Sequence, residues 1–191
     1  MRTFVAIEVC DEVQSALRAA QRAMGRLPGV RWTDPSGVHL TLKFIGDIEN
    51  ALVPAVFDVM RSAVSAIEPF EFSVHGLGFF PPGRRPRVLW AGVDGAGEEM
   101  ALLAHRLDEG LAGLGVAMDN HRFRPHLTLG RARGTIDSET VEAAFARLAR
   151  GDFGGQHVSE IALFMSELHP TGAAYTRMGV VPLKEKGEEG D

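Results

Sequence analysis

The tetrapeptide His-Leu-Thr-Leu occurs twice in this sequence, at residues 39–42 and again at residues 126–129. Histidine titrates with a pKa of about 6.5, so one imidazole can be neutral and another protonated close to neutral pH. Two histidines on opposite sides of a phosphorus atom can therefore act as general base and general acid, while threonine hydroxyls hydrogen-bond the phosphoryl oxygens. His39 with Thr41, and His126 with Thr128, are the candidate catalytic and phosphate-binding residues.

Both copies lie in segments that have the residue types of β-strands, residues 38–45 and 126–131. Side chains two residues apart share a face of a strand, so each histidine points with its threonine while the leucines point into the core. If the two halves are related by an approximate two-fold, both polar pairs face one cleft. The same alternation assigns Lys43 to the His39 face, as a candidate phosphate contact, and Phe44 to the core.

Three further residues are candidates for contact with a substrate. Arg131 suits charge-assisted contacts to phosphate oxygens, but a regular strand points it away from Thr128, so a bend at Gly130 is needed. Arg124 belongs to a group of arginines around the second motif, which predicts either a positive rim for RNA phosphates or a solvated surface. Trp32 can stack on a base or pack in the core. His-x-Thr is not a usual pair of metal ligands, so no metal is expected.

The composition is that of an ordinary globular protein. The 191 residues are 45% hydrophobic and 24% charged, with a net charge of −5. This acidic balance argues against broad, nonspecific coating of nucleic acid. No apolar run approaches the roughly 20 residues of a membrane span. A single cysteine, Cys10, cannot form an internal disulfide, so a reducing cytoplasm is the expected location.

Strand and helix patterns intermix without strict alternation, which predicts an α+β fold with a largely antiparallel sheet. Apolar residues at helical spacing predict helices over residues 11–27, 50–67 and 97–114 and from about residue 138. Strands are expected over residues 2–9, 30–33, 38–45, 70–80, 87–93, 126–131, 158–166 and 174–182. One domain over residues 1–183 is expected, followed by a flexible acidic tail over residues 184–191.

The sequence resembles the 2H phosphoesterases, and among them the bacterial and archaeal RNA 2′,3′-cyclic phosphodiesterases, also called 2′-5′ RNA ligases. Residues 39–46 look like the first motif of that family, and residues 124–131 look like the second motif with its arginine. Residues 1–7 look like its opening strand, residues 84–90 like the entry to its central strand, and residues 163–183 like its closing hairpin. The resemblance covers nearly the whole chain.

This resemblance implies a bilobal, pseudo-two-fold α+β fold, with two mainly antiparallel sheets around a central cleft and helices on the outside. It implies hydrolysis of an RNA terminal 2′,3′-cyclic phosphate to a 2′-phosphomonoester, with His39 as proton donor and His126 as proton acceptor. Thr41, Thr128 and Arg131 would hold the phosphate. The reverse reaction would form a 2′-5′ bond. The implied protein is a cytoplasmic monomer without a cofactor or a membrane contact, and it acts on RNA ends, tRNA fragments and nucleotides included.

Two other functions are compatible with the same residues. The chain could be a non-catalytic module that binds nucleotides or RNA ends, although intact histidines are not needed merely to bind. It could also be a phosphodiesterase for small cyclic nucleotides or for a cyclic phosphate of ADP-ribose. Turnover of an oligonucleotide end compared with turnover of a mononucleotide separates these enzymes.

Overall fold

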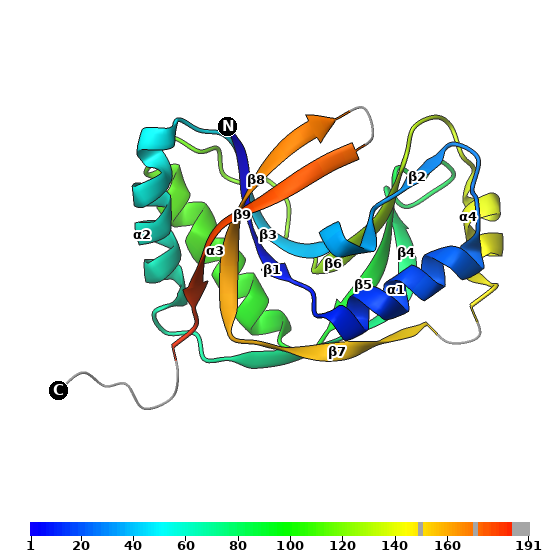
Figure 1. Ribbon diagram of the computed structural model, residues 1–191, viewed down its shortest axis with the longest axis horizontal. Coiled ribbons are helices and arrows are strands. Elements are labelled where there is room, and N and C mark those ends of the chain that lie inside the picture. Colours follow the sequence, from blue (N-terminus) through cyan, green and yellow to red (C-terminus); the bar gives the residue numbers. More distant parts are fainter. Residues whose placement is uncertain (149–150, 170–171, 185–191) are drawn as a thin grey trace.

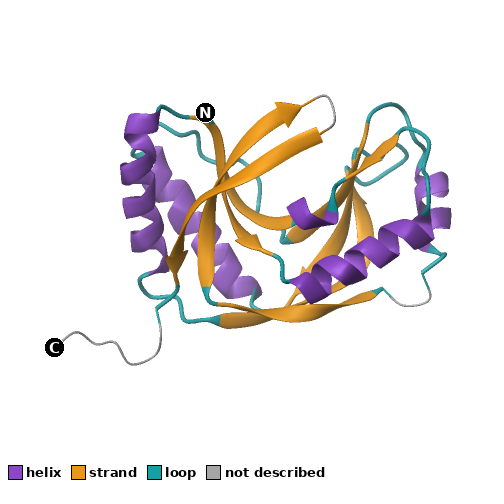
Figure 2. Cartoon of the chain, viewed as in Figure 1, coloured by secondary structure: helices purple, strands orange, loops and turns teal. Residues whose placement is uncertain are grey.

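The computed structural model describes residues 1–148, 151–169 and 172–184 and shows a nine-stranded sheet with helices packed against it (Figures 1 and 2). The strands are β1 (Arg2–Glu8), β2 (Val30–Trp32), β3 (His39–Asp47), β4 (Phe70–Phe80), β5 (Val88–Asp94), β6 (His126–Ala132), β7 (Asp152–Val158), β8 (Glu160–His169) and β9 (Gly172–Pro182). The α-helices are α1 (Asp11–Met24), α2 (Val53–Val64), α3 (Gly97–Ala112) and α4 (Ser138–Phe145), with 3₁₀ turns η1 (Pro35–Gly37) and η2 (Asn50–Leu52).

The strand order contains a pseudo-two-fold. The sheet runs β7-β4-β5-β6-β3-β1-β8-β9, and β2 pairs with β6 beside this path. From the centre outward, β6-β5-β4-β7 on one side corresponds to β3-β1-β8-β9 on the other. The pairs along this path are antiparallel, and β3 meets β6 through Leu40 and Leu127. The expected bilobal α+β fold is confirmed, with the two expected antiparallel sheets joined into one by this pairing.

The helices exchange sides between the two halves. Helix α1 follows β1 in the chain but packs against β7, whereas α3 follows β5 but packs against β3. Helix α2 lies against α3 and β9, and Figure 1 shows α1 and α4 together at the opposite end of the molecule. No helix in the described part of the chain is long and apolar enough to cross a membrane.

Because each half supplies a helix to the other, we propose that residues 1–183 fold as one domain, as the sequence predicts. At the end of this domain the Leu183 amide donates to the Ser159 carbonyl at 2.8 Å. The expected tail begins at Lys184, whose amide donates to the Ile67 carbonyl at 3.1 Å. Residues 185–191 of that tail lie outside the described residues.

One hydrophobic core lies between the sheet and the helices. Leu40 and Leu127, the pair that joins the halves, are both fully buried, as is Leu129, and Leu42 is nearly so. This confirms the inward direction predicted for the leucines of both motifs. Each fully buried leucine contributes about 1.5–3 kcal/mol relative to exposure, so the core holds the two motif strands in place.

Both motif strands contain a β-bulge just after the threonine. On β1, which pairs with β3, the neighbours Ala6 and Val5 pair with Thr41 and Lys43, so Leu42 has no partner. Opposite β6, Trp90 pairs with Thr128 while its neighbour Leu89 pairs with Gly130. One residue on each motif strand, Leu42 or Leu129, is therefore extra. An extra residue reverses the alternation of side chains beyond it.

The bulge in β3 corrects two predictions made from regular alternation. Lys43 points to the helix side and is buried, with its Nζ 2.5 Å from Asp108 Oδ1 and 3.1 Å from Asp119 Oδ2. It also donates to the Ala117 carbonyl at 2.9 Å. Phe44 points to the opposite face and is 59% exposed. Lys43 therefore does not share a face with His39, and Phe44 is not a core residue.

We expect Lys43→Met to lower the free energy of unfolding by about 3–5 kcal/mol, because it leaves the largely buried Asp108 carboxylate without its cation. Urea denaturation measures this loss. Lys184→Met, at an exposed lysine, should unfold like the wild type. The double variant Lys43→Met, Asp108→Asn should recover part of the loss. A Lys43→Met protein as stable as the wild type would contradict a stabilising ion pair between Lys43 and Asp108.

Candidate active site

The two histidines lie on the face of the sheet that is opposite the helices, hereafter the open face. In an antiparallel pair, the residue before one partner lies beside the residue after the other. The Leu40–Leu127 pair therefore places His39 beside Thr128 and His126 beside Thr41. The four side chains are half-buried, as the alternating pattern of both strands shows. The structure thus brings both predicted pairs to one place.

A hydrogen bond from Nδ1 to a backbone carbonyl orients each of the two imidazoles. His39 Nδ1 lies 2.8 Å from the Gly37 carbonyl oxygen, and His126 Nδ1 lies 2.7 Å from that of Arg124. A carbonyl oxygen can only accept, so Nδ1 carries the proton in each ring. Nε2 of each ring is then the nitrogen that can give or take a proton in a reaction. In both strands the carbonyl belongs to the residue two positions before the histidine.

His39 is packed among aromatic rings. Phe4 stacks on the imidazole with a centroid distance of 4.5 Å, and Tyr175 meets it edge-on at 5.0 Å. Burial lowers the pKa of His39 from its usual 6.5 to about 4; the Gly37 hydrogen bond acts against this shift, whereas the charges of Arg131 and His126 add to it. The imidazole is therefore neutral near pH 7 in the free protein.

His126 has a second aromatic environment. Phe80 meets its ring edge-on at 5.1 Å, and Phe80 in turn packs on Trp90 at 5.1 Å. The Trp90 ring lies so close over Gly78 that a Cβ there would overlap it, so only glycine fits. Burial is also the main cause that lowers the His126 pKa; the bond to the Arg124 carbonyl opposes it and the Arg131 charge reinforces it.

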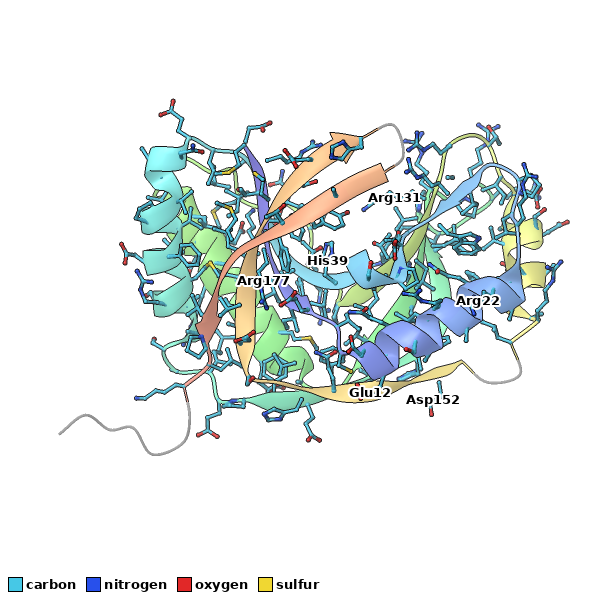
Figure 3. The ribbon with its side chains drawn as sticks, viewed as in Figure 1. Glu12, Arg22, His39, Arg131, Asp152 and Arg177 are labelled. Atoms are coloured by element: carbon cyan, nitrogen blue, oxygen red, sulfur yellow. The ribbon has the colours of Figure 1, made fainter. Side chains whose placement is uncertain are left out.

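The bulge in β6 brings Arg131 to the histidines. Beyond the extra residue Leu129, Gly130 is buried and Arg131 is exposed on the open face. Its charge contributes to the lowered pKa of both His39 and His126. Figure 3 shows Arg131 and His39 on neighbouring parts of this face. The bend that the sequence required for Arg131 is therefore present.

Two other predicted contacts are placed differently. Trp32 lies on the core side, over Gly130, and its indole N–H donates to the Gly25 carbonyl at 2.9 Å. This packing connects β2 to the end of α1 and agrees with the core-packing alternative that the sequence offered for Trp32. Arg124 contacts His126 through its backbone carbonyl, and its side chain is exposed on the surface before β6.

Several residues at the site were not found from the sequence. Phe4, Tyr175 and Phe80 line the imidazoles, and Glu8 lies opposite His39 in the β1–β3 register. The Glu8 carboxylate binds Arg177 at 2.9 Å, a contact between the first and last strands of the described chain. Aromatic residues in strands are typical of cores, so nothing local in the sequence distinguished these from packing residues.

The arrangement suits proton transfer around a phosphate. Two oriented imidazoles supply an acid and a base, two hydroxyls can donate to phosphoryl oxygens, and one guanidinium can neutralise negative charge. Within the described ranges, no group of three or more histidine, cysteine, aspartate or glutamate side chains is arranged to hold a metal ion.

Comparison with known proteins agrees with the two-fold organisation. The family described as LigT-like phosphoesterase matches the chain twice, over residues 7–90 and 92–175. An RNA 2′,3′-cyclic phosphodiesterase of Methanothermobacter thermautotrophicus is 32% identical over 184 residues, 96% of this chain and 99% of that protein. One from Archaeoglobus fulgidus is 31% identical over 180 residues, 94% of this chain and 99% of the relative. A crystal structure of a Thermus thermophilus protein, 28% identical, superposes with a TM-score of 0.82, covering 97% of this chain and 100% of that one.

The lowered pKa of the half-buried His39 predicts a specific loss of stability in acid. Its pKa is lower in the folded than in the unfolded protein, so the unfolded chain binds more protons between about pH 6.5 and 4. Stability therefore falls as pH drops through this window, by up to about 3 kcal/mol from His39. We expect His39→Gln to lose less stability than the wild type between about pH 7 and about pH 4.5 in urea denaturation.

His105→Gln, which removes an exposed imidazole on α3, is the matched control and should follow the wild type. An equal acid-induced loss in wild type and His39→Gln would show that His39 is not buried as described.

Proposed function

Because this chain belongs to the family of LigT-like phosphoesterases, we propose that it hydrolyses the 2′,3′-cyclic phosphate at RNA ends to a 2′-phosphomonoester. The observation that carries the proposal is the pair of half-buried imidazoles on the open face, each with Nδ1 held by a backbone carbonyl and Nε2 available. The two relatives described above bear the name of this activity and share the length of the chain.

In the proposed reaction the two histidines move one proton each. His126 Nε2 accepts a proton from water, whose oxygen forms the new bond to phosphorus. The bond from phosphorus to O3′ breaks, and O3′ takes the proton from His39 Nε2. The product keeps its phosphate on O2′. His39 ends neutral and His126 protonated, so exchange of one proton with solvent at each ring restores the starting state.

The anionic substrate favours the protonated form of His39. Burial keeps His39 neutral in the free protein, but a bound phosphate diester brings a negative charge next to the imidazole. Thr41, Thr128 and Arg131 hold the phosphoryl oxygens and stabilise the charge that develops on them. Since imidazoles and a guanidinium supply the acid, the base and the positive charge, the proposed mechanism is independent of a metal.

The same groups serve the reverse reaction. A 5′-hydroxyl in the place of water would lose its proton to His126 and form a 2′-5′ phosphodiester bond. We propose that the enzyme acts as a cytoplasmic monomer on RNA ends such as those of tRNA fragments. The exposed Arg124 side chain is proposed to contact RNA phosphates near the second motif.

The central test is hydrolysis of an RNA oligonucleotide that ends in a 2′,3′-cyclic phosphate, with excess EDTA. We expect the wild type to release a 2′-phosphate. His39→Ala and His126→Ala should each lose about 10²–10⁴-fold in kcat, because each removes a general acid or base. His105→Ala is the control and should keep wild-type turnover, since its imidazole is exposed on α3.

A substrate with sulfur in place of the bridging O3′ separates the two roles. A thiolate leaves without a proton, so His39→Ala should regain most of its rate on this substrate while His126→Ala stays impaired. The opposite pattern would exchange the two roles. Wild-type turnover in both alanine variants would sink the mechanism, and no turnover of any cyclic phosphate by the wild type would favour a binding module.

Arg131 links the mechanism to pH. Reaction requires one protonated and one neutral imidazole, and burial followed by the Arg131 charge lowers the pKa of both. We expect the alkaline limb of kcat/KM for the cyclic phosphate to lie below pH 6.5, the pKa of an ordinary imidazole, because both imidazoles have a lowered pKa in the free protein. Arg131→Gln should lower the maximum and move this alkaline limb to higher pH. Arg22→Gln, at an exposed arginine of α1, should leave the profile unchanged. An Arg131→Gln profile that keeps the wild-type limb would place Arg131 away from the histidines.

A further inference from the structure

The exposed ion pair between Glu8 and Arg177 belongs to the open face. Glu8 lies directly opposite His39 in the β1–β3 register, so these two side chains share that face. Arg177 pairs with Phe164 on β8, whose ring stacks on Phe4. In the view of Figure 3, Arg177 and His39 lie on neighbouring parts of this face. The guanidinium therefore reaches toward the histidines from β9, the outermost strand of its half.

Small side chains give the Arg177 guanidinium its path across the sheet. Strand β8 lies between β9 and β1, and on it Ala162 pairs with Ala6. Both alanines are buried, and the aliphatic stem of an arginine can cover apolar surface of this kind. In the other half, Trp90 takes the place of Ala6 opposite the motif threonine, and its ring lies over Gly78. The room that an arginine needs is thus present in the first half and filled in the second.

The Glu8 carboxylate marks a place where Arg177 holds an anion. Glu8 Oε2 lies 2.9 Å from Arg177 Nη1, which is a charge-assisted hydrogen bond. Both side chains are about half exposed, and such a pair adds little stability, so another anion can replace the carboxylate at small cost. A guanidinium offers phosphate the same fork of N–H donors that it offers a carboxylate. The position of the Glu8 carboxylate is therefore one where a phosphate can bind.

This position lies close to the proposed reaction centre. Directly opposite residues in an antiparallel pair have Cα atoms about 4.5–5.5 Å apart, so Glu8 starts next to His39. An RNA chain that ends in a cyclic phosphate has one other phosphate on its last ribose, at O5′. The cyclic phosphate occupies O2′ and O3′, so the ribose alone separates the two phosphates. A cyclic phosphate held between the histidines thus brings the O5′ phosphate within reach of Arg177.

We propose that Arg177 binds the phosphate on O5′ of the nucleoside that carries the cyclic phosphate, and that this phosphate displaces Glu8. The inference rests on the proposed function and adds a substrate class, because it favours nucleosides phosphorylated at O5′ over those with a free 5′-hydroxyl. In an RNA chain the O5′ phosphate is the last internucleotide linkage. Glu8 competes with that phosphate for the guanidinium, so removal of its charge strengthens the binding.

The test uses three adenosine 2′,3′-cyclic phosphates that differ at O5′. One has a free hydroxyl, one a methyl phosphate diester and one a phosphate monoester. The diester carries the single negative charge of an RNA linkage without a second nucleoside, whereas the monoester is the group of a mononucleotide. The quantity compared is the preference, which is kcat/KM for a phosphorylated substrate divided by kcat/KM for the hydroxyl substrate in the same protein. A general loss of catalysis cancels in this ratio.

We expect the wild type to prefer the methyl phosphate substrate by about 5–50-fold, the range for a charge-assisted contact that replaces an exposed ion pair, with the difference in KM. Arg177→Gln should abolish the preference, and Arg177→Lys should keep part of it. Glu8→Gln should increase the preference, because the competing carboxylate is gone. Added salt should weaken the preference, since the contact is exposed.

Arg61→Gln is the matched control. Arg61 donates to Asp58 at 2.6 Å in an exposed ion pair on α2, on the helix side of the sheet. This variant removes an exposed guanidinium that is paired with a carboxylate, as Arg177→Gln does, so it should keep the wild-type preference. Thermal unfolding of each variant verifies that the fold is kept.

The outcomes separate this inference from the proposed function. If the wild type hydrolyses neither these substrates nor the RNA oligonucleotide, the proposed function fails and the O5′ phosphate site with it. If it hydrolyses the oligonucleotide but shows no preference among the three, or if Arg177→Gln keeps the preference, the site is overturned and the function stands. A preference for the monoester alone would assign the site to mononucleotides and overturn its role for an RNA linkage.

Discussion

The active site depends on the antiparallel contact of Leu40 with Leu127, where the two halves of the sheet meet. This contact is fully buried, so the register of β3 against β6 is held by the core rather than by solvent-exposed groups. A shift of one residue would turn every side chain of a strand to the other face. The same pairing therefore buries the leucines of both motifs and brings each histidine beside the threonine of the other half.

Two equivalent bulges make the site asymmetric. The backbone departs from regular alternation after Thr41 and after Thr128, but the residues that follow differ between the halves. On the helix side, the buried Lys43 forms ion pairs with Asp108 and Asp119, whereas the equivalent Gly130 leaves room for the ring of Trp32. On the open face the difference is between Phe44 and Arg131. A duplicated scaffold thereby places different side chains on the two sides of the histidines.

Regular periodicity predicted the part of the site that regular strands build. His39, Thr41, His126 and Thr128 share a face because they precede the bulges, and their leucines are buried as expected. Beyond the bulge the same reasoning gave the wrong face for Lys43 and Phe44, because an extra residue has no signature in the local sequence.

The strand β7 was missed for a related reason. The sequence predicted a strand that begins at Val158, but the structure adds a separate strand over Asp152–Val158. Its Asp-Phe-Gly-Gly sequence lacks the β-branched run typical of a strand, and it exists because it pairs with β4. The aromatic contacts around His39 likewise join β1 and β3 to β8 and β9, at the other end of the described chain. Long-range pairing decides these features, and no local window of sequence contains it.

The aromatic surroundings of His39 explain why the imidazole proposed as the acid is neutral in the free protein. Stacked rings and burial exclude the solvent that would stabilise an imidazolium. The charge of Arg131 raises the free-energy cost of protonating His39 further. In the proposed mechanism, a phosphate diester between the two histidines offsets this cost, since it supplies the opposite charge to the ring and to the guanidinium. Protonation of His39 would thereby be coupled to the presence of the proposed substrate. The rings that keep His39 neutral continue through Phe4 to Phe44, so the apolar surface that suppresses the charge reaches the exposed part of the open face.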